Sequence, residues 1–308
     1  MLKLAANGYV INELGQILLI RRDDTRTWAF PGGSLDAGEL PPDGAAREVE
    51  EETGLKVLPV RLVNVDFWPG NVGGFLLFGF RCLQRGGALS PSPESPQVGF
   101  YSPKMLPRPM FHEHRQRLTR VFGHRGGPPL LHQAQPDWTW RLGWFTLRNL
   151  IYPWKNLLRR LRSQPAYVEP PLWQAGAFSV IRNDKDQVLW VRRTDKDVWN
   201  LPGGVHEDGE SPWQTAVRET EEETGLKVKL DRLYGVYVKP ERNEIVFNFT
   251  AQAVGGQLTT GPEAAEFAFF TPGQEPPNSL AKQVARVADL AAGMETAVFR
   301  QQPATMTA

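Results

Sequence analysis

A segment of 23 residues occurs twice in this chain. Residues 33–55 read GSLDAGELPPDGAAREVEEETGL and residues 204–226 read GVHEDGESPWQTAVRETEEETGL, so the second copy follows the first by 171 positions. In both copies a glycine is followed by Gly-Glu, then by Arg-Glu, two further glutamates and a closing Gly-Leu. Because an internal repeat is the signature of a duplicated structural unit, we expect two related domains.

Length and composition agree with two domains. The chain has 308 residues, which corresponds to about two domains of ordinary size, and we place them at 1–124 and 173–308 with a linker at 125–172. Lys and Arg number 35 against 34 Asp and Glu, so no net charge attracts the whole chain to nucleic acid or to an anionic membrane. Cys82 is the only cysteine, which excludes an intrachain disulfide and a cysteine-rich zinc site. With no signal peptide and no run of 18 apolar residues, we expect a cytoplasmic protein without a transmembrane segment.

Regular elements are predicted in the same order in both halves. Hairpins are expected at 9–22 and 175–193, where two apolar runs flank a polar turn. Apolar runs also predict a pair of strands in each half, and amphipathic spacing predicts a closing helix. The strands are expected at 58–65, 74–83, 232–238 and 245–254, and the helices at 111–122 and 279–292.

Each copy of the repeat predicts a short acidic helix. Asp43 is placed to cap its N-terminus in the first copy, and Gly54 to end it in a left-handed turn. Glu48, Glu51 and Glu52 are spaced i, i+3 and i+4, so their carboxylates share one face of the helix. Like charges on one face repel each other, and a divalent cation would offset the repulsion.

Oxygen ligands without Cys or His favour Mg²⁺ or Mn²⁺, ions that also bridge phosphate oxygens. Arg47 lies four residues before Glu51 and can hold its carboxylate by a salt bridge, and Glu39 can reach the same place from the preceding loop. The implied reaction is phosphoryl transfer to water. The alternative is a solvated acidic helix face, but solvent exposure gives no reason for the same frame to recur.

The repeated segment resembles the signature of the Nudix hydrolases, G-x5-E-x7-R-E-U-x-E-E-x-G-U, where U is a bulky aliphatic residue. All nine specified positions match in the first copy, whereas Thr220 replaces the aliphatic residue on the core side of the second helix. The matching residues are Gly33, Glu39, Arg47, Glu48, Val49, Glu51, Glu52, Gly54 and Leu55, and then Gly204, Glu210, Arg218, Glu219, Glu222, Glu223, Gly225 and Leu226.

The resemblance implies an α/β (α+β) fold with two α/β/α sandwich domains, each built on a mixed sheet. It also implies hydrolysis of a nucleoside diphosphate linked to another group, in which water attacks phosphorus. The candidate substrates are ADP-ribose-like compounds, nucleoside triphosphates and dinucleotides. The residues implied as metal ligands are Glu39, Glu48, Glu51, Glu52, Glu210, Glu219, Glu222 and Glu223. The residues implied in catalysis are Glu51, Glu52, Glu222, Glu223, Glu266, Arg47 and Arg218.

Glu266 lies in the segment after the last long predicted strand of the second unit, and residues 255–270 of this segment align with 86–101 of the first unit. Nudix proteins often place another glutamate in this loop, where it binds metal or acts as a base. The first unit has Gln97 at that position, which cannot deprotonate water, so we expect the second unit to be the stronger enzyme.

Candidate substrate-binding residues precede each repeat. An Arg-Arg pair closes the hairpin, and its second arginine can reach a substrate phosphate or form a salt bridge within the protein. The Pro-Gly-Gly that follows allows close approach of the backbone. These candidates are Arg22, Gly32 and Gly33 in the first unit, and Arg193, Gly203 and Gly204 in the second. Pro69 follows Gly54 by 15 residues, and Pro240 follows Gly225 by 15. A proline at this distance is similar to ADP-ribose-type members of the family or is only a loop proline.

Residues 138–162 have the most unusual composition in the chain. They contain four tryptophans and several arginines but no acidic residue. Nucleic-acid binding, a membrane-surface segment and packing between the two domains all fit this composition. Three functions therefore stay open: a tandem Nudix pyrophosphohydrolase, a nucleotide sensor with one weak unit, and a hydrolase that acts on RNA in the manner of a decapping enzyme.

Overall fold

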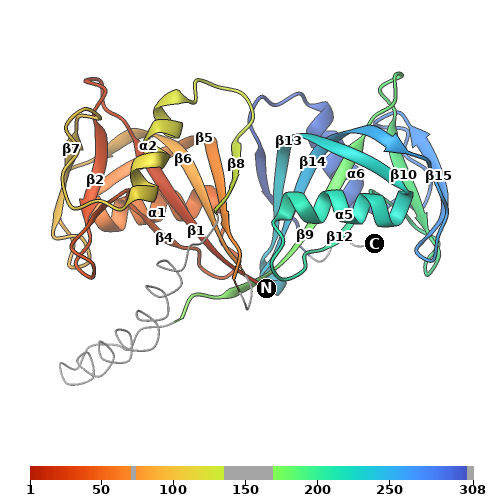
Figure 1. The fold of residues 1–308 in the computed structure, drawn as a ribbon, viewed down its shortest axis with the longest axis horizontal. Helices are drawn as coiled ribbons and strands as arrows, with labels where there is room; N and C mark the ends of the chain where they lie inside the picture. Colours follow the sequence, from red (N-terminus) through yellow and green to blue (C-terminus); the bar gives the residue numbers. More distant parts are fainter. Residues whose placement is uncertain (71–73, 135–168, 304–308) are drawn as a thin grey trace.

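The computed structural model describes residues 1–70, 74–134 and 169–303 (Figure 1). The first half contains β1 (Leu2–Val10), β2 (Ile17–Arg21), β3 (Trp28–Ala29), β4 (Gly32–Ser34), α1 (Pro41–Thr53), β5 (Leu55–Trp68), β6 (Gly74–Gly87), β7 (Gln97–Tyr101), α2 (His112–Gly123) and β8 (Leu130–Gln133). The second half contains β9 (Leu172–Ile181), β10 (Val188–Arg193), β11 (Trp199–Asn200), β12 (Gly203–Val205), α5 (Pro212–Thr224), β13 (Leu226–Lys239), the 3₁₀ turn η2 (Pro240–Arg242), β14 (Glu244–Gly256), β15 (Ala264–Phe270), α6 (Ala281–Ala291) and β16 (Val298–Gln301). The predicted mixed α/β fold and the duplication of its elements are confirmed.

One sheet runs through both halves. Its strand order in the described residues is β16-β13-β14-β9-β1-β6-β5-β8, with β12 added to β9 and β4 added to β1. The halves join where β1 and β9 pair antiparallel, Leu2 opposite Trp173 and Lys3 opposite Leu172. Figure 1 shows this junction at the centre of the molecule. The repeat predicts two units, but it does not predict that they share a sheet.

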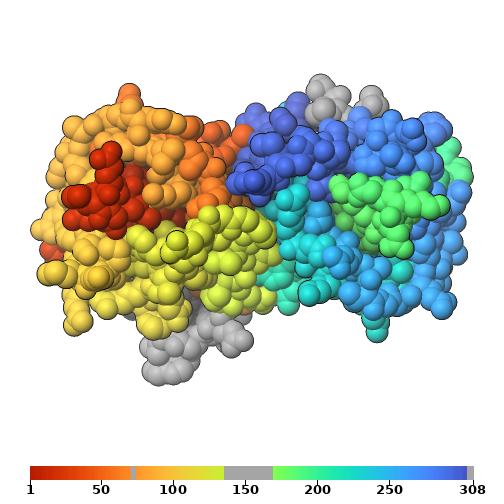
Figure 2. Space-filling view, turned by 90° about the horizontal axis from the view of Figure 1, so that it is seen from above, coloured from red at the N-terminus to blue at the C-terminus, as the bar shows by residue number. Residues whose placement is uncertain are grey.

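The hydrophobic core also crosses the junction. The rings of Phe78 and Phe247, one from each unit, stack at 6.1 Å with an interplanar angle of 4°. Phe299 from β16 packs edge-on against Phe78 and against Phe80, at 6.3 and 5.3 Å. Trp173 is fully buried beside them in the same cluster. Figure 2 accordingly shows the two units in contact along the middle of the molecule.

A smaller sheet lies behind each half of the large one. These sheets have the orders β3-β2-β7 and β11-β10-β15. The hairpin expected at 9–22 is wrong in detail, because β1 and β2 share only the bridge between Ile11 and Ile17 and then diverge into different sheets. Tyr9 and Ile17 pack together with Leu118 of α2, so α2 covers the layer between the two sheets.

The helices of the repeat begin differently. α1 has Leu40 at its N-cap position, without a side-chain hydrogen bond, so the predicted cap at Asp43 is wrong; Asp43 lies in the first turn instead. α5 has a capping box, in which the side chain of Ser211 accepts from the backbone of Gln214 and the Gln214 side chain accepts from the Ser211 N–H. Both helices end at the predicted left-handed glycine, which is Gly54 in α1.

Part of the expected linker is a strand. β8 lies within 125–172 and pairs in parallel with β5, which extends the first unit as far as Gln133. The basic, tryptophan-rich stretch 138–162 lies outside the described residues. Within the described residues, no helix is long and apolar enough to cross a membrane.

Candidate active site

The Pro-Gly-Gly turn brings backbone onto the acidic face of the helix in each unit. In the first unit, the N–H of Gly32 donates to Glu52 Oε2 at 2.8 Å. A Cβ added to Gly33 would lie 2.5 Å from Glu48 Oε1, so no larger residue fits without moving that carboxylate. In the second unit, the N–H of Gly203 donates to Glu223 Oε2 at 2.9 Å. The predicted glycines therefore lie at the carboxylates.

Arg47 links the carboxylates of the first unit. Its Nε and Nη2 bind both oxygens of Glu39, each at 2.9 Å. Its Nη1 binds Glu48 Oε1 at 2.9 Å and Glu51 Oε2 at 3.2 Å. Its Nη2 also donates to the Ser34 carbonyl at 3.0 Å, which fixes the guanidinium against β4. The predicted Arg47–Glu51 contact is thus one of three contacts to glutamate.

Arg218 repeats this arrangement in the second unit. It binds Glu210 through two nitrogens, at 3.1 and 2.8 Å. Its Nη1 binds Glu219 and Glu222, both at 2.9 Å. The Val205 carbonyl takes the place of the Ser34 carbonyl, at 3.1 Å. Two matching networks exist although most of the surrounding residues differ.

One glutamate of each helix is set apart from the arginine. Glu52 accepts from the Gly32 N–H and from Ser95 Oγ at 3.2 Å, and burial raises its pKa to about 7. Burial likewise raises the pKa of Glu223 to about 7. A carboxylate with such a pKa can accept a proton near neutral pH.

The donor chemistry of this face fits a hard divalent cation. Within the described residues no three acidic, His or Cys side chains stand together as a ready metal site, because the guanidinium lies among the carboxylates. Even so, Glu48 and Glu51 already converge on one atom, Arg47 Nη1, so a cation near that point would reach both. Burial raises the pKa of Glu48, and the charges of Glu51 and Glu39 raise it further. The ionised form of Glu48 is therefore destabilised, and a bound cation would reduce this destabilisation.

The second arginine of each Arg-Arg pair lies near the buried glutamate. Arg22 binds Asp24 through two nitrogens, at 2.9 and 2.6 Å, and its charge acts to lower the pKa of Glu52. Arg193 binds Asp195 in the same way, at 2.7 and 2.9 Å. Each arginine thus forms the salt bridge within the protein that was one of the two alternatives, and the contact with a substrate phosphate stays a prediction.

The loop glutamate near this face is Glu263 rather than Glu266. Burial is the main cause of the raised pKa of Glu223, and the charge of Glu263 raises it further. Glu266 instead pairs across the strands with Arg192 and accepts from its Nη1 at 3.2 Å. The segment 255–270 that aligns with 86–101 contains both Glu263 and Glu266.

The first unit has the same loop glutamate. Gln97 pairs with Arg21 as Glu266 pairs with Arg192, which confirms the loop alignment. By this alignment Glu94 corresponds to Glu263, and the carbonyl of Glu94 accepts from the Asp23 N–H as that of Glu263 does from the Thr194 N–H. The presence of Gln97 therefore gives no reason to rank the first unit as weaker.

The departure at Thr220 is compensated within the core. Its hydroxyl donates to the Ala216 carbonyl at 2.6 Å and lies within hydrogen-bond distance of Ser179 Oγ, at 2.9 Å. In the first unit Val49 takes this place, and its methyl group would lie 2.3 Å from a Cβ added to Gly8. The pair Thr220 and Ser179 in the second unit thus takes the place of the pair Val49 and Gly8 in the first. The acidic face of the helix is unchanged.

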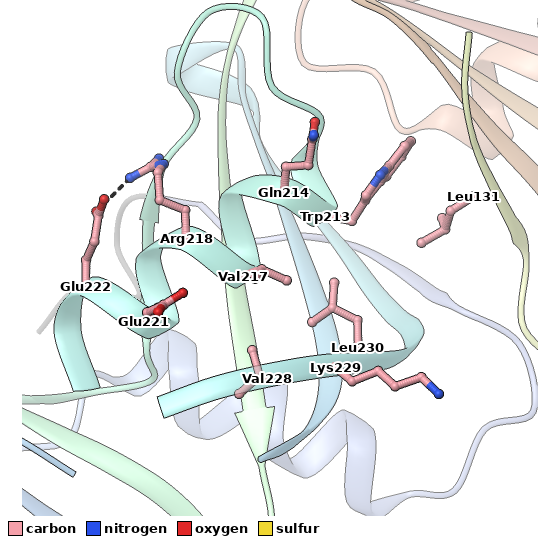
Figure 3. A pocket seen from close by; sticks show the side chains of 10 residues that line it. All are labelled: Leu131, Trp213, Gln214, Val217, Arg218, Glu221, Glu222, Val228, Lys229 and Leu230. Carbon is pink, nitrogen blue, oxygen red and sulfur yellow. Dashed lines mark hydrogen bonds and ion pairs between the residues drawn. The ribbon is translucent and has the colours of Figure 1, made fainter. Parts of the chain in front are cut away.

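A groove of about 710 Å³ runs along the outer side of α5 (Figure 3). Arg218 and Glu222 lie at one end of it. Trp213 lies at the other end beside Leu131, which comes from β8 of the first unit. The groove therefore connects the carboxylate face with the contact between the two units.

Comparison with known proteins gives a family. The family model described as NUDIX domain matches residues 1–122 and 172–290. Among curated proteins, a putative 8-oxo-dGTP diphosphatase of Bacillus subtilis is 38% identical over 106 residues, which are 34% of this chain and 71% of that protein. An ADP-ribose pyrophosphatase of Methanocaldococcus jannaschii is 36% identical over 118 residues, which are 36% of this chain and 68% of that protein. Each of the two matches about a third of the chain, the size of one unit.

Among solved structures, an ADP-ribose pyrophosphatase from Streptococcus suis matches with 24% identity and a TM-score of 0.36. The match covers 42% of this chain and 100% of that one.

Proposed function

This chain belongs to the NUDIX domain family, and on that premise we propose that it is a divalent-metal-dependent pyrophosphohydrolase with two active sites. The substrate would be a nucleoside diphosphate linked to a second group, cleaved by attack of water on phosphorus. The observation that carries the proposal is the pair of matching networks in which Arg47 and Arg218 each hold three glutamates beside a buried fourth.

Each residue has a distinct part in this proposal. Glu48, Glu51 and Glu52 would hold the metal, as would Glu219, Glu222 and Glu223, with Glu39 and Glu210 assisting. A cation held there would neutralise the pyrophosphate and lower the pKa of the attacking water. Arg47 and Arg218 are positioning residues, because they orient the carboxylates and contact no reacting atom.

Glu52 and Glu223 are candidates for taking the proton from water, because each is held against the glycine turn by the N–H of Gly32 or Gly203. Glu94 and Glu263 are the alternative bases, from the loop that lies beside each site. Arg22 and Arg193 would bind a substrate phosphate, because each already holds a carboxylate with the bidentate geometry that arginine uses with oxyanions.

The names of the relatives suggest which substrate classes to test first. The names of the two curated relatives refer to a modified nucleoside triphosphate and to ADP-ribose. We propose these two classes first, with dinucleotides and sugar nucleotides next. The sensor alternative for the first unit is the less favoured one, because Glu94 stands at the position aligned with Glu263. Action on RNA would depend on 138–162, and nothing in the described residues favours it.

The test is a turnover screen with magnesium on these four classes, followed by Glu52→Gln, Glu223→Gln and the double variant. Because each variant removes one proton acceptor and one metal ligand, we expect the double variant to lose at least about 100-fold in kcat. Each single variant should keep the turnover of its untouched unit.

Glu50→Gln and Glu221→Gln are matched controls, because these glutamates stand on the same helices but outside the arginine networks, and we expect them to keep full turnover. Full turnover by the double variant would refute the assignment of both sites.

A further inference from the structure

The loop before each repeat helix is held in place by different side chains in the two units. His206 of the second unit occupies the position of Leu35, which lies 171 residues earlier in the first. The His206 N–H donates to the Ala175 carbonyl at 2.9 Å, and the Leu35 N–H donates in the same way to the Leu4 carbonyl, at 3.0 Å. Both side chains are buried. A polar ring therefore lies where the first unit has an apolar side chain.

The imidazole of His206 is bound to the backbone of Glu210. Its Nε2 lies within hydrogen-bond distance of the Glu210 carbonyl oxygen. Because a carbonyl oxygen only accepts, Nε2 carries the proton and His206 is the donor. Burial lowers the pKa of His206, so the ring is neutral near pH 7 and its Nδ1 carries no proton. The ring thus provides a single donor, and that donor is used on the loop.

The carboxylate of Glu210 connects this loop with the active site. Arg218 binds both of its oxygens, at 3.1 and 2.8 Å. The N–H of Glu207 and the hydroxyl of Thr215 also donate to Glu210 Oε1, each at 2.8 Å. The guanidinium of Arg218 in turn binds two further glutamates of α5. The position of the Glu210 backbone therefore affects where the guanidinium and those glutamates lie.

The first unit has apolar contact at the same place. Gly44 stands at the position of Thr215, and a Cβ added to Gly44 would lie 2.4 Å from Leu35 Cδ2. Leu35 thus packs directly onto the helix. In the second unit His206 and Thr215 replace Leu35 and Gly44, and both of them bind Glu210. The two units hold the same loop glutamate by different means.

The ring of His206 rests on a side chain of the other unit. Phe67 meets it edge-on, at a centroid distance of 6.2 Å and an interplanar angle of 76°. The same ring meets Trp213 of α5 at 6.2 Å and 82°. Phe67 is fully buried in β5, which pairs on its two sides with β6 and β8. A Cβ added to Gly74 would lie 2.3 Å from the Phe67 ring, so the ring has little room to move.

We propose that His206 and Phe67 are positioning residues of the second active site. His206 holds the backbone of Glu210, and Phe67 holds the ring of His206 across the junction between the units. The second site is therefore complete only when the first unit is docked against it. Leu35 cannot donate a hydrogen bond, so the first site is not built in this way. This inference rests on the proposed function of the second site.

The test measures the second unit alone, in the Glu52→Gln background. The substrate is 8-oxo-dGTP or ADP-ribose with magnesium, whichever is cleaved faster. His206→Leu introduces the residue found at position 35. Because leucine fills the space but lacks the donor, we expect kcat to fall about tenfold, with KM within about twofold of the parent. His206→Gln keeps a side-chain N–H donor and should retain kcat within about threefold of the parent.

Phe67→Leu separates this role from a general loss of stability. Although Phe67 belongs to the first unit, its replacement should lower kcat of the second unit about fivefold, measured in Glu52→Gln. It should leave kcat of the first unit, measured in Glu223→Gln, unchanged. Val63→Ala is the control, because Val63 is equally buried on the same strand but packs in a cluster of the first unit alone. It should leave kcat of the second unit unchanged.

A double-mutant cycle tests whether His206 acts through Glu210. In the presence of Glu210→Ala, the further change His206→Leu should lower kcat less than about twofold, because no carboxylate remains to be positioned. Losses that add, or full kcat in His206→Leu alone, would overturn the assignment. Circular dichroism establishes that each variant is folded, and Phe67→Met replaces Phe67→Leu if the latter is not.

Hydrogen exchange separates this inference from the proposed function, because it needs no substrate. The Glu207 N–H donates to Glu210 Oε1, so His206→Leu should accelerate exchange in peptides that cover 206–210 and not in those that cover 35–39. If exchange accelerates but no nucleotide of the screen is cleaved, the proposed function fails and the hold of His206 on Glu210 stands. If nucleotides are cleaved and neither exchange nor kcat changes, the function stands and the positioning role fails.

Discussion

At the scale of single residues, the arginine of the repeat shows how far the sequence can predict the site. Helical spacing predicted the contact between Arg47 and Glu51, and the structure contains it. The sequence predicted less specifically that Arg47 forms two hydrogen bonds with Glu39, because Glu39 reaches Arg47 only when the loop before α1 folds back. Local spacing determines contacts within a helix, whereas contacts from a loop depend on its path.

The loop glutamates illustrate the same limit. Glu263 and Glu266 both lie in the aligned loop, and a sequence offers no way to know which side chain faces the helix. The pairing of β10 with β15 settles it, since it directs Glu266 to Arg192. A single sequence does not reveal this strand register, and a catalytic role for Glu266 stays a prediction.

His114 in α2 carries a prediction about pH. Burial lowers its pKa to about 3, and the charges of Arg117 and Arg22 lower it further. Its Nδ1 is buried without a hydrogen-bond partner in the described residues. The folded protein therefore excludes a proton that the unfolded chain binds below about pH 6.5, so stability is complete above that pH and is lost as the pH falls.

We expect the free energy of unfolding of the metal-free protein to fall by about 1 kcal/mol more between pH 7 and 5.5 than that of His114→Gln. Glutamine is the residue at the corresponding position 283 of the second unit. Urea titrations at each pH measure the difference, and His112→Gln, exposed on the same helix, is the control. Identical pH profiles of wild type and His114→Gln would show that folding does not lower the pKa of His114.

At the scale of secondary structure, helices were predicted well and hairpins less so. The closing helices lie within two residues of the predicted 111–122 and 279–292, since amphipathic spacing and Gly or Pro stops are local signals. The strands β8 and β16 were missed, because each has four residues and pairs in parallel with a distant strand. Short strands that depend on distant partners leave little local pattern.

The loop before each repeat helix provides a matched pair of glycines. Gly38 has φ 72° and Gly209 has φ 91°, so alanine is strained at both positions. A Cβ at Gly38 would lie 2.8 Å from Pro240 of η2, in the other unit, whereas a Cβ at Gly209 would have no atom within 4 Å. Gln301 also donates to the Gly38 carbonyl at 3.3 Å. The first unit's loop is therefore in contact with the second unit.

We predict that Gly38→Ala lowers the free energy of unfolding by about 1 kcal/mol more than Gly209→Ala, because only the former adds a clash between the units. Chemical denaturation of the two variants measures the difference, and the strain from positive φ cancels in the comparison. Equal losses would mean that the loop and η2 separate freely.

At the scale of the whole molecule, the junction between the two units could not be predicted from the sequence. The repeat indicates two units, but the pairing of β1 with β9 joins residues about 170 positions apart, and neither strand carries a signal for the other. His206 shows the same effect, since this loop histidine, which is followed by two acidic residues, is buried against the Phe67 ring at a centroid distance of 6.2 Å. Interfaces between duplicated units follow from surface shape, which a single sequence does not display.

Trp173 tests whether the units fold together. It is fully buried at the junction opposite Leu2, so Trp173→Ala should lower the free energy of unfolding by about 3–5 kcal/mol. Because the sheet is shared, amide exchange in β1 should also accelerate. Hydrogen exchange measured by mass spectrometry reports on each strand separately.

Trp190→Ala is the control, since Trp190 is equally buried but belongs to a cluster formed by the second unit alone. It should accelerate exchange in the second unit more than in β1. If Trp173→Ala leaves exchange in β1 unchanged, the two units are independent despite their contact.

The contacts of Phe78 with the rings of Phe247 and Phe299 also impose an order on folding during synthesis. The first unit leaves the exit tunnel long before β14 and β16 have been translated, so its half of the aromatic face has no partner while the nascent chain grows. Newly made first units are therefore open to capture by chaperones, or by the first units of neighbouring chains on the same messenger, until the last strand is released. A stop codon placed just before Phe299 would remove its edge-on contacts with Phe78 and Phe80 and leave that part of the face uncovered for the lifetime of the protein.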